Sequence, residues 1–111
     1  MKAASGLRKD EDFRRVYRQK NSMANRLLII YIGKNNLGYS RAGFTVTKKI
    51  GKSVVRNKVK RRMRESYRLN KDKIINGYDL IFIARTRCSE ANYREIESAM
   101  LHLLRKKRLL I

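Results

Sequence analysis

The sequence has few of the residues on which most metal binding and nucleophilic catalysis depend. It contains one cysteine, Cys88, and one histidine, His102, so it can form neither an internal disulfide nor a zinc site built from cysteine and histidine. A lone cysteine is typical of a reducing compartment, and we expect the cytoplasm. We expect Cys88 to be an inert thiol after an apolar strand, and His102 to be a packed or surface residue.

Acidic residues are also scarce. The nine Asp and Glu residues are dispersed, and only Asp10, Glu11 and Asp12 cluster, at what reads as the start of a helix. A nuclease that acts alone would need clustered carboxylates to bind a metal ion or to serve as a general base. The sequence also has no glycine-rich phosphate loop, no nucleophile elbow and no HExxH motif. It therefore argues against a self-sufficient protein nuclease.

Long hydrophobic runs and chain-breaking segments are missing as well. The longest apolar run, Leu27–Ile32, has the length of a strand, far short of the roughly 20 residues that span a membrane. No signal peptide, repeat, proline or low-complexity segment is evident. The length of 111 residues and the apolar fraction of 42% predict a single domain, residues 1–111, of which the basic residues 1–9 are expected to be mobile.

Positive charge is what the chain has in excess, with a formal net charge of +20. It is concentrated in Lys48–Arg68, where ten of twenty-one residues are Lys or Arg and only Glu65 is acidic. Within this stretch Val55, Val59 and Met63 recur at steps of four, which predicts the apolar stripe of a helix. We call the basic arc the six polar residues that a helical wheel places within about 140° on the other side: Arg56, Asn57, Lys60, Arg61, Arg64 and Arg68.

A charged helical face is often merely solvated, but such faces usually mix the two signs. Here Arg56, Lys60 and Arg64 follow one another at i,i+4, where like charges repel. Guanidinium groups also suit phosphate, to which they can donate two parallel hydrogen bonds. A membrane surface would attract the same charge, but the pattern favours a nucleic acid as the partner, bound in a salt-dependent way.

The remaining patterns predict three helices and at least three strands. Asp10–Gln19 reads as a short helix capped by Asp10, and the basic helix is expected to run from an N-cap at Ser53 to about Leu69. Asn92 and Glu95 resemble a capping box that opens a final helix, after which Arg105–Arg108 form a basic patch. Strands are expected at residues 26–32, 39–47 and 78–86.

These elements predict an α+β fold or α/β sandwich with one small sheet. The first two strands are expected to pair as an antiparallel hairpin through the turn residues 33–36. Gly43, inside the second of them, indicates a bulge or the close approach of another backbone. General rules would make the strand–helix–strand crossover right-handed.

Two long strings resemble the signature of the bacterial ribonuclease P protein subunit: AGFTVTKKIGKSVVRNKVKRRMRE and KDEDFRRVYRQKNSMANRLLIIY. The resemblance covers nearly the whole chain. The family's RNR element stands here as Arg56-Asn57-Lys58, with Lys in the third position. Because Lys58 projects outside the basic arc on the helical wheel, we expect this departure to matter little.

For the fold, the resemblance implies a fourth short strand near Ser22–Arg26 and the order αβββαβα. It also implies a left-handed βαβ crossover, against the general rule.

For function, the resemblance implies the protein subunit of a ribonucleoprotein enzyme that removes the 5′ leader of precursor tRNA. The partners would be the catalytic RNA and precursor tRNA, with no membrane and no protein partner required. The RNA would carry the chemistry with Mg²⁺, bound mainly by RNA, and the protein would have no catalytic residue.

The resemblance also assigns two sets of site residues. The basic arc would contact the catalytic RNA. The leader would lie between the first helix and the sheet, on Phe13, Tyr17, Tyr31, Thr45, Thr47 and Lys48. Aromatic rings offer single-stranded bases a stacking surface, although Phe13 could instead be plain core. Asn57 could bind RNA or merely cap a neighbouring loop. A stand-alone RNA-binding module, such as a ribosomal protein or an RNA chaperone, is the alternative reading of the whole chain.

Overall fold

The computed structural model describes residues 6–7 and 9–111. Residues 1–5 and 8, which belong to the segment 1–9 expected to be mobile, lie outside the described residues. The α-helices are α1 (Asp10–Arg18), α2 (Ser53–Asn70) and α3 (Tyr93–Lys106). The strands are β1 (Ser22–Ala24), β2 (Leu28–Lys34), β3 (Arg41–Thr45) and β4 (Tyr78–Ala84). Three short 3-10 turns are η1 (Lys48–Ile50), η2 (Lys71–Lys73) and η3 (Thr86–Glu90). The order αβββαβα is confirmed, including the short first strand.

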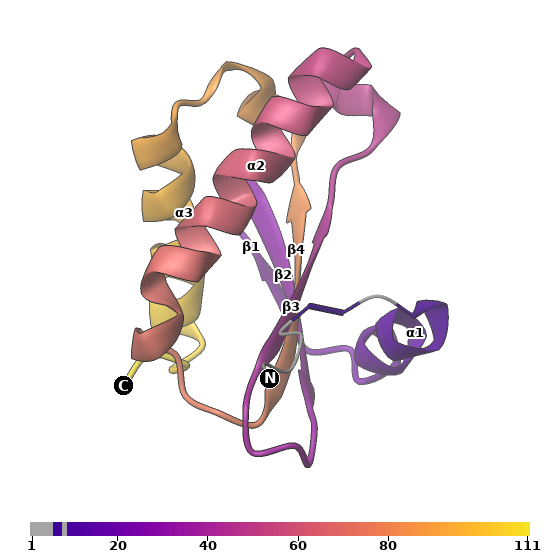
Figure 1. The fold of residues 1–111 in the computed structure, drawn as a ribbon, viewed down its shortest axis with the longest axis vertical. Helices are drawn as coiled ribbons and strands as arrows, with labels where there is room; N and C mark the ends of the chain where they lie inside the picture. Colours follow the sequence, from indigo (N-terminus) through magenta and orange to yellow (C-terminus); the bar gives the residue numbers. More distant parts are fainter. Residues whose placement is uncertain (1–5, 8) are drawn as a thin grey trace.

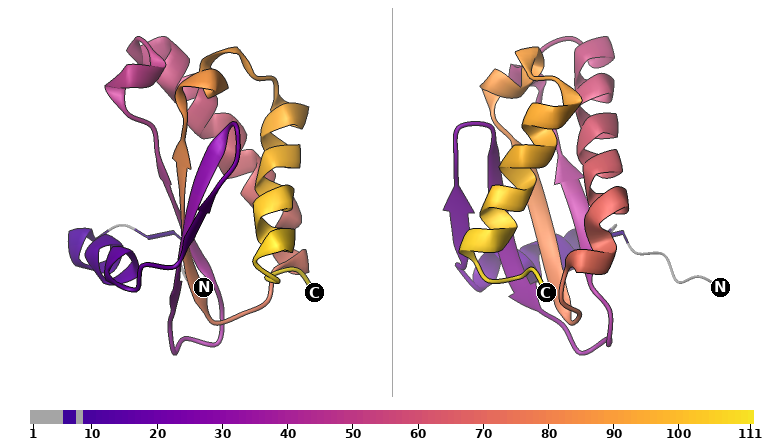
Figure 2. Two further views of the ribbon diagram at one scale, coloured as in Figure 1. Left: turned by 180° about the vertical axis from the view of Figure 1, so that it is seen from behind. Right: turned by 90° about the vertical axis from the view of Figure 1, so that its left-hand side faces the viewer.

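The four strands form one mixed sheet that separates α1 from the other two helices. The sheet order is β1-β2-β4-β3, with β3 parallel to β4 and the other pairs antiparallel. Figure 1 shows the sheet nearly edge-on, with α1 on one face and α2 and α3 on the other, and Figure 2 shows the same layers from two further sides.

The predicted hairpin between residues 26–32 and 39–47 is wrong. β4 lies between β2 and β3, and β2 pairs instead with β1 and β4. The reason lies in the faces of the strands: β4 is apolar on both, with Leu80, Ile81 and Phe82 all fully buried, which suits a central strand. β3 begins with a charged residue, Arg41, and contains Gly43, and it forms the edge.

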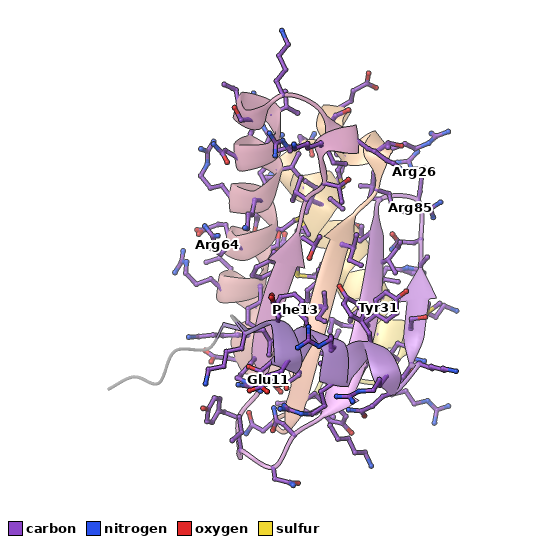
Figure 3. All side chains as sticks on the ribbon, turned by 90° about the vertical axis from the view of Figure 1, so that its right-hand side faces the viewer. Glu11, Phe13, Arg26, Tyr31, Arg64 and Arg85 are labelled. Atoms are coloured by element: carbon purple, nitrogen blue, oxygen red, sulfur yellow. The ribbon has the colours of Figure 1, made fainter. Side chains whose placement is uncertain are left out.

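The crossover from β3 through α2 to β4 is left-handed. Figure 3 views the sheet from the α1 side: β3 lies to the left of β4, both strands point upward, and α2 lies on the far face. This is the handedness that the family resemblance implies, and it is opposite to the one that general rules favour.

Successive side chains of each strand point to opposite faces of the sheet, and the apolar ones form a separate core on each face. On the face of α2 and α3, Phe82 and Leu80 pack against residues that include Met63 and Met100. On the α1 face, Ile81 packs with the smaller set Leu7, Val16, Phe13, Tyr17, Tyr31 and Ile83. The larger core therefore fixes α2, and the smaller one fixes α1.

Two of the three predicted helix caps are wrong. Lys9 and not Asp10 is the N-cap of α1, because the carbonyl of Lys9 already accepts hydrogen bonds from the first turn. In the same way Lys52 replaces Ser53 at α2, since the Arg56 N–H donates to the Lys52 carbonyl. The capping box of Asn92 and Glu95 at α3 is confirmed.

Candidate nucleic-acid interface

The basic arc lies on the outer side of α2, as its spacing predicts. Val59 and Met63 are 1% and 0% exposed, and Val55 packs partly against the same core. The opposite side of the helix therefore faces solvent. Four members of the arc are exposed, namely Asn57, Arg61, Arg64 and Arg68, while Arg56 and Lys60 are half-buried.

Two arginines of the arc already have contacts within the chain. Arg56 Nε donates to the carbonyl of Gly51 at 3.1 Å, which ties the start of α2 to the loop before it. Arg68 Nε donates to Glu65 Oε1 at 3.0 Å, and this contact raises the pKa of Arg68 and lowers that of Glu65. The pair is exposed, and such pairs contribute little to stability, so a phosphate can displace Glu65.

Lys58, the departure from the family pattern, is exposed on a different side of α2. On the helical wheel it lies beside Arg62, whose Nη1 donates to the carbonyl of Ala91 at 2.7 Å. That side of the helix faces η3 and not the arc. Lys58 thus lies outside the basic arc, as the helical wheel predicts, and its small role in RNA binding stays a prediction.

Three aromatic side chains meet between α1 and the sheet. Phe13 and Tyr17 come from α1 and Tyr31 from β2, and all three are half-buried. The rings of Tyr17 and Tyr31 meet edge to face with centroids 4.8 Å apart, and those of Phe13 and Tyr17 are 6.4 Å apart. We call these three residues the aromatic face; Figure 3 shows Phe13 and Tyr31 on this side of the molecule.

Phe13 is partly a core residue and partly a surface residue. Its ring lies so close to Gly43 that a Cβ there would be 2.6 Å from the Phe13 Cζ. The close approach predicted at Gly43 is therefore real, but it comes from a side chain and not from a backbone. Phe13 therefore packs partly in the smaller core, while the rest of its side chain remains exposed; its role in binding the leader stays a prediction.

Thr45 on β3 belongs to the same surface. Burial raises the pKa of the Tyr17 hydroxyl, and a hydrogen bond with Thr45 opposes that effect. Thr47 and Lys48 are exposed and follow β3, on the segment that leads through η1 into α2. Four of the six predicted leader-binding residues thus gather on one face, and the other two lie past the end of β3.

The sequence analysis missed the ionic network that attaches α1 to the sheet. Asp79, at 1% exposure, accepts two hydrogen bonds from Arg41, and Arg41 Nη1 also lies 3.7 Å from Asp12 Oδ2 on α1. Burial of Asp79 was not foreseen. The sequence does place an acidic residue near the start of a strongly apolar strand. A carboxylate buried there must be paired, which could have predicted a cationic partner.

A second missed feature is a cavity of about 350 Å³ beside the basic arc. Its apolar floor includes Phe44 and Tyr67, and burial raises the pKa of the Tyr67 hydroxyl to about 12. Gly6, which bridges to Ala42 of β3, closes one side. Its rim carries the cations Arg64, Arg68 and Lys71.

Among residues 6–7 and 9–111, no three His, Cys, Asp or Glu side chains converge as a metal site would require. Cys88 is fully buried, and burial raises the pKa of its thiol to about 11. In the described part of the chain, no helix has the length and apolar character to cross a membrane. What the structure offers a ligand is positive charge beside aromatic surface.

Comparison with known proteins gives one consistent result. The model of the family described as Ribonuclease P matches residues 1–108. The ribonuclease P protein component of Alkaliphilus oremlandii is 60% identical over 110 residues, covering 99% of this chain and 96% of that protein. That of Clostridioides difficile is 48% identical, covering 91% of this chain and 90% of that protein.

Solved structures agree with the sequence relatives. The Staphylococcus aureus RNase P protein superposes with a TM-score of 0.88 at 33% identity, covering 98% of this chain and all of that one. The Thermotoga maritima RNase P protein superposes with a TM-score of 0.83 at 34% identity, covering 91% of this chain and 96% of that one.

Proposed function

Because the chain belongs to the ribonuclease P protein family, and so is a protein component of the holoenzyme that matures tRNA 5′ ends, we propose a division of labour between its two surfaces. The basic arc of α2 binds the catalytic RNA, and the aromatic face with Thr45, Thr47 and Lys48 binds the 5′ leader of precursor tRNA.

The observation that carries this proposal is the continuity of the two surfaces at the end of β3. The aromatic face reaches Thr45 at the last residue of β3, and α2 begins eight residues later at Ser53. Thr47 and Lys48 lie exposed between them. A strand of RNA that follows the aromatic face toward Lys48 therefore arrives at the first turns of α2, where Arg56 and Asn57 stand.

The two surfaces act by different physical means. Each phosphate that a Lys or Arg neutralises releases counterions, so binding by the arc depends steeply on salt. Each base that stacks on Tyr17 or Tyr31 gains about 1–3 kcal/mol with little preference for sequence, which suits leaders of varied sequence. A stand-alone RNA-binding module, the alternative reading, is not favoured by the relatives.

The chemistry belongs, in this proposal, to the RNA with Mg²⁺. Mg²⁺ is held through oxygen ligands such as carboxylates, and the described residues offer no cluster of them. We assign its binding mainly to RNA and its role to the cleavage step. The chain's own contribution is to bind and orient, and we expect it to need no protein partner and to act in the cytoplasm.

Reconstitution tests the proposal directly. The purified chain is added to a transcribed RNase P RNA at low Mg²⁺, and cleavage of precursor tRNA is measured. We expect cleavage only when both are present. Cleavage by the RNA-free protein would contradict the assignment of the chemistry, and no gain over the RNA alone would contradict the binding roles.

A further inference from the structure

A second cluster of cations surrounds a large hollow away from both proposed RNA surfaces. The hollow has a volume of about 560 Å³ and lies between the β1–β2 turn and α3. We call its three exposed guanidinium groups, from Arg26, Arg94 and Arg105, the arginine rim. Arg105 belongs to the basic patch predicted from the sequence, which the proposed function does not use.

The guanidinium groups of the arginine rim remain available to bind an anion. Within residues 6–7 and 9–111, none of the three guanidinium groups lies in an ion pair. The one acid at the hollow, Glu95, is occupied by the capping box, where its Oε1 accepts from the Asn92 N–H at 2.9 Å. An anion in the hollow would therefore meet three cations and one partly satisfied carboxylate.

The wall of the hollow is fixed by Asn25, whose amide joins the turn to α3. Its Oδ1 accepts from the N–H groups of Leu27 and Leu28, at 3.1 and 2.9 Å. Its Nδ2 donates to the carbonyl of Ala99 at 2.9 Å. The amide is fully used, so the hollow exists before any ligand binds, and less ordering entropy is lost on binding.

Asn25 also sets the state of His102, which lines the hollow. Because two backbone donors fix the Asn25 oxygen, Nδ2 must be the atom that faces His102 Nδ1 at 3.1 Å, and it donates there. The imidazole Nδ1 then accepts, and the ring proton is on Nε2. Nε2 is thus the ring nitrogen of His102 that the contact with Asn25 leaves free to bind a ligand.

The position of the rim separates it from the basic arc. The sheet order places β1 and β3 at opposite edges, with the β1–β2 turn at one side and α2 beside the other. Figure 3 shows Arg26 and, near it, Arg85 on one side of the sheet and Arg64 on the other, with α1 between them in front. Arg85 Nη1 donates to the carbonyl of Asn25 at 2.7 Å and braces the same turn.

We propose that the arginine rim and His102 bind backbone phosphates of a second RNA segment, so that the protein holds RNA at both edges of its sheet. Guanidinium groups and an imidazole N–H match phosphate oxygens, and the volume accommodates a phosphate with its ribose. This inference relies on the proposed function only in that the holoenzyme supplies the RNA, either as catalytic RNA or as tRNA.

The test compares Arg94→Ala/Arg105→Ala and the two single variants with Lys106→Ala. This control removes one charge from an exposed residue of the same helix that does not line the hollow, so it matches each single variant. Affinities are measured for the catalytic RNA alone, and then for precursor and mature tRNA with the assembled holoenzyme. We expect the double variant to lose about tenfold or more in one of these affinities, since it removes two groups that can donate charge-assisted hydrogen bonds to phosphate. The slope of log K against log salt should become shallower by roughly 0.7–0.9 for each phosphate that the variant no longer neutralises.

The outcomes separate the possible sources of the phosphate. A loss toward the catalytic RNA alone identifies that RNA as the ligand, and an equal loss toward precursor and mature tRNA in a normally assembled holoenzyme identifies the body of tRNA. Affinities that match those of Lys106→Ala throughout would overturn the inference. If the parent protein fails to activate the RNA at all, the proposed function fails instead.

A second measurement does not depend on removing charge. Ser98 is exposed and lines the hollow, whereas Cys88 is fully buried. A thiol-reactive photo-crosslinker would therefore attach to the new cysteine of Ser98→Cys and not to Cys88. In an active holoenzyme, we expect the photo-crosslinker at residue 98 to form crosslinks to RNA. Their absence in a holoenzyme that still cleaves precursor tRNA would contradict the proposal.

Discussion

Arg41 of β3 and Asp79 of β4 form a bidentate ion pair between the two neighbouring strands. Arg41 Nε donates to Asp79 Oδ1 at 2.9 Å and Nη2 to Oδ2 at 2.7 Å, and the pair raises the pKa of Arg41. Asn35 donates to the same carboxylate at 2.7 Å, and Asp12 of α1 lies 3.7 Å from the third guanidinium nitrogen. Arg41, which pairs with the buried carboxylate of Asp79, therefore also attracts Asp12 on α1, the helix that provides two residues of the aromatic face.

Arg41→Ala should therefore destabilise the fold strongly. It leaves Asp79 buried without its cation, and breaking a buried pair in this way typically costs about 3–5 kcal/mol. Denaturant unfolding measures the loss. Arg15→Ala is the control, because its pair with Asp12 is half-exposed and should be worth about 1 kcal/mol or less. Similar losses of unfolding free energy in the two variants would show that the buried pair stabilises the fold no more than the half-exposed one.

Tyr17→Ala should weaken binding of precursor tRNA and spare assembly with the catalytic RNA. We expect a loss of about 1–3 kcal/mol for precursor tRNA and no loss for mature tRNA, which has no leader to stack. Holoenzyme affinities for the two substrates give the comparison. Tyr17→Phe keeps the ring and removes only the hydroxyl near Thr45, so it should retain most of the affinity. Equal losses for both substrates would place Tyr17 outside the leader site.

Arg64→Ala should weaken binding to the catalytic RNA and flatten its dependence on salt. Arg64 is exposed at the middle of the basic arc, and each phosphate contact contributes roughly 0.7–0.9 to the slope of log K against log salt. Lys58→Ala removes the same charge from another side of α2 and should change the slope less. The measurement is a salt titration of affinity, and equal changes in both variants would refute the arc as the RNA-facing side.

Gly43→Ala should push Phe13 away from the sheet. The new Cβ would lie 2.6 Å from the Phe13 Cζ, so the ring must move, and overpacking of this kind usually costs about 1–3 kcal/mol. Thermal unfolding tests stability, and precursor-tRNA affinity tests the aromatic face. Phe13→Leu in the same chain replaces the ring with a shorter side chain and should recover part of the stability. No recovery would mean that Gly43 is required for another reason.

Cys88 should be unreactive in the folded protein. Its side chain is fully buried, and burial raises the pKa of the thiol to about 11, so almost no thiolate is present at a pH of about 8. We expect slow reaction with a thiol reagent in buffer and fast reaction in denaturant. Since the pKa is higher in the folded state than in the unfolded one, this residue's contribution to stability is lost as the pH rises from about 9 to 11. Cys88→Ala should remove that part of the alkaline loss.

The sequence predicted the features that depend on local spacing. The recurrence of Val59 and Met63 located the buried side of α2 and hence the basic arc, because helical periodicity relates residues four apart. Asn92 and Glu95 located the start of α3, because the two hydrogen bonds of a capping box join residues only three positions apart. The short strand β1 and the left-handed crossover came only from the family resemblance.

What the sequence did not predict depends on which strands are neighbours. The insertion of β4 between β2 and β3 is decided between segments far apart in the chain, and a local turn signal at residues 33–36 pointed elsewhere. The pairing of Asp79 with Arg41 follows from that arrangement, and the hollow behind Asn25 depends on contacts between the β1–β2 turn and α3. Such contacts become visible only when distant segments are placed side by side.

The central place of β4 has a consequence for the synthesis of the chain. β4 is made last of the four strands, yet it supplies the sheet partner of β3 and the long partner of β2. While the ribosome is still adding residues 78–84, the nascent chain already contains α2 with its dense positive charge, but not the apolar strand on which the sheet closes. Both proposed RNA surfaces therefore depend on a strand that is synthesised after the segments of α1, β2, β3 and α2 that carry their residues.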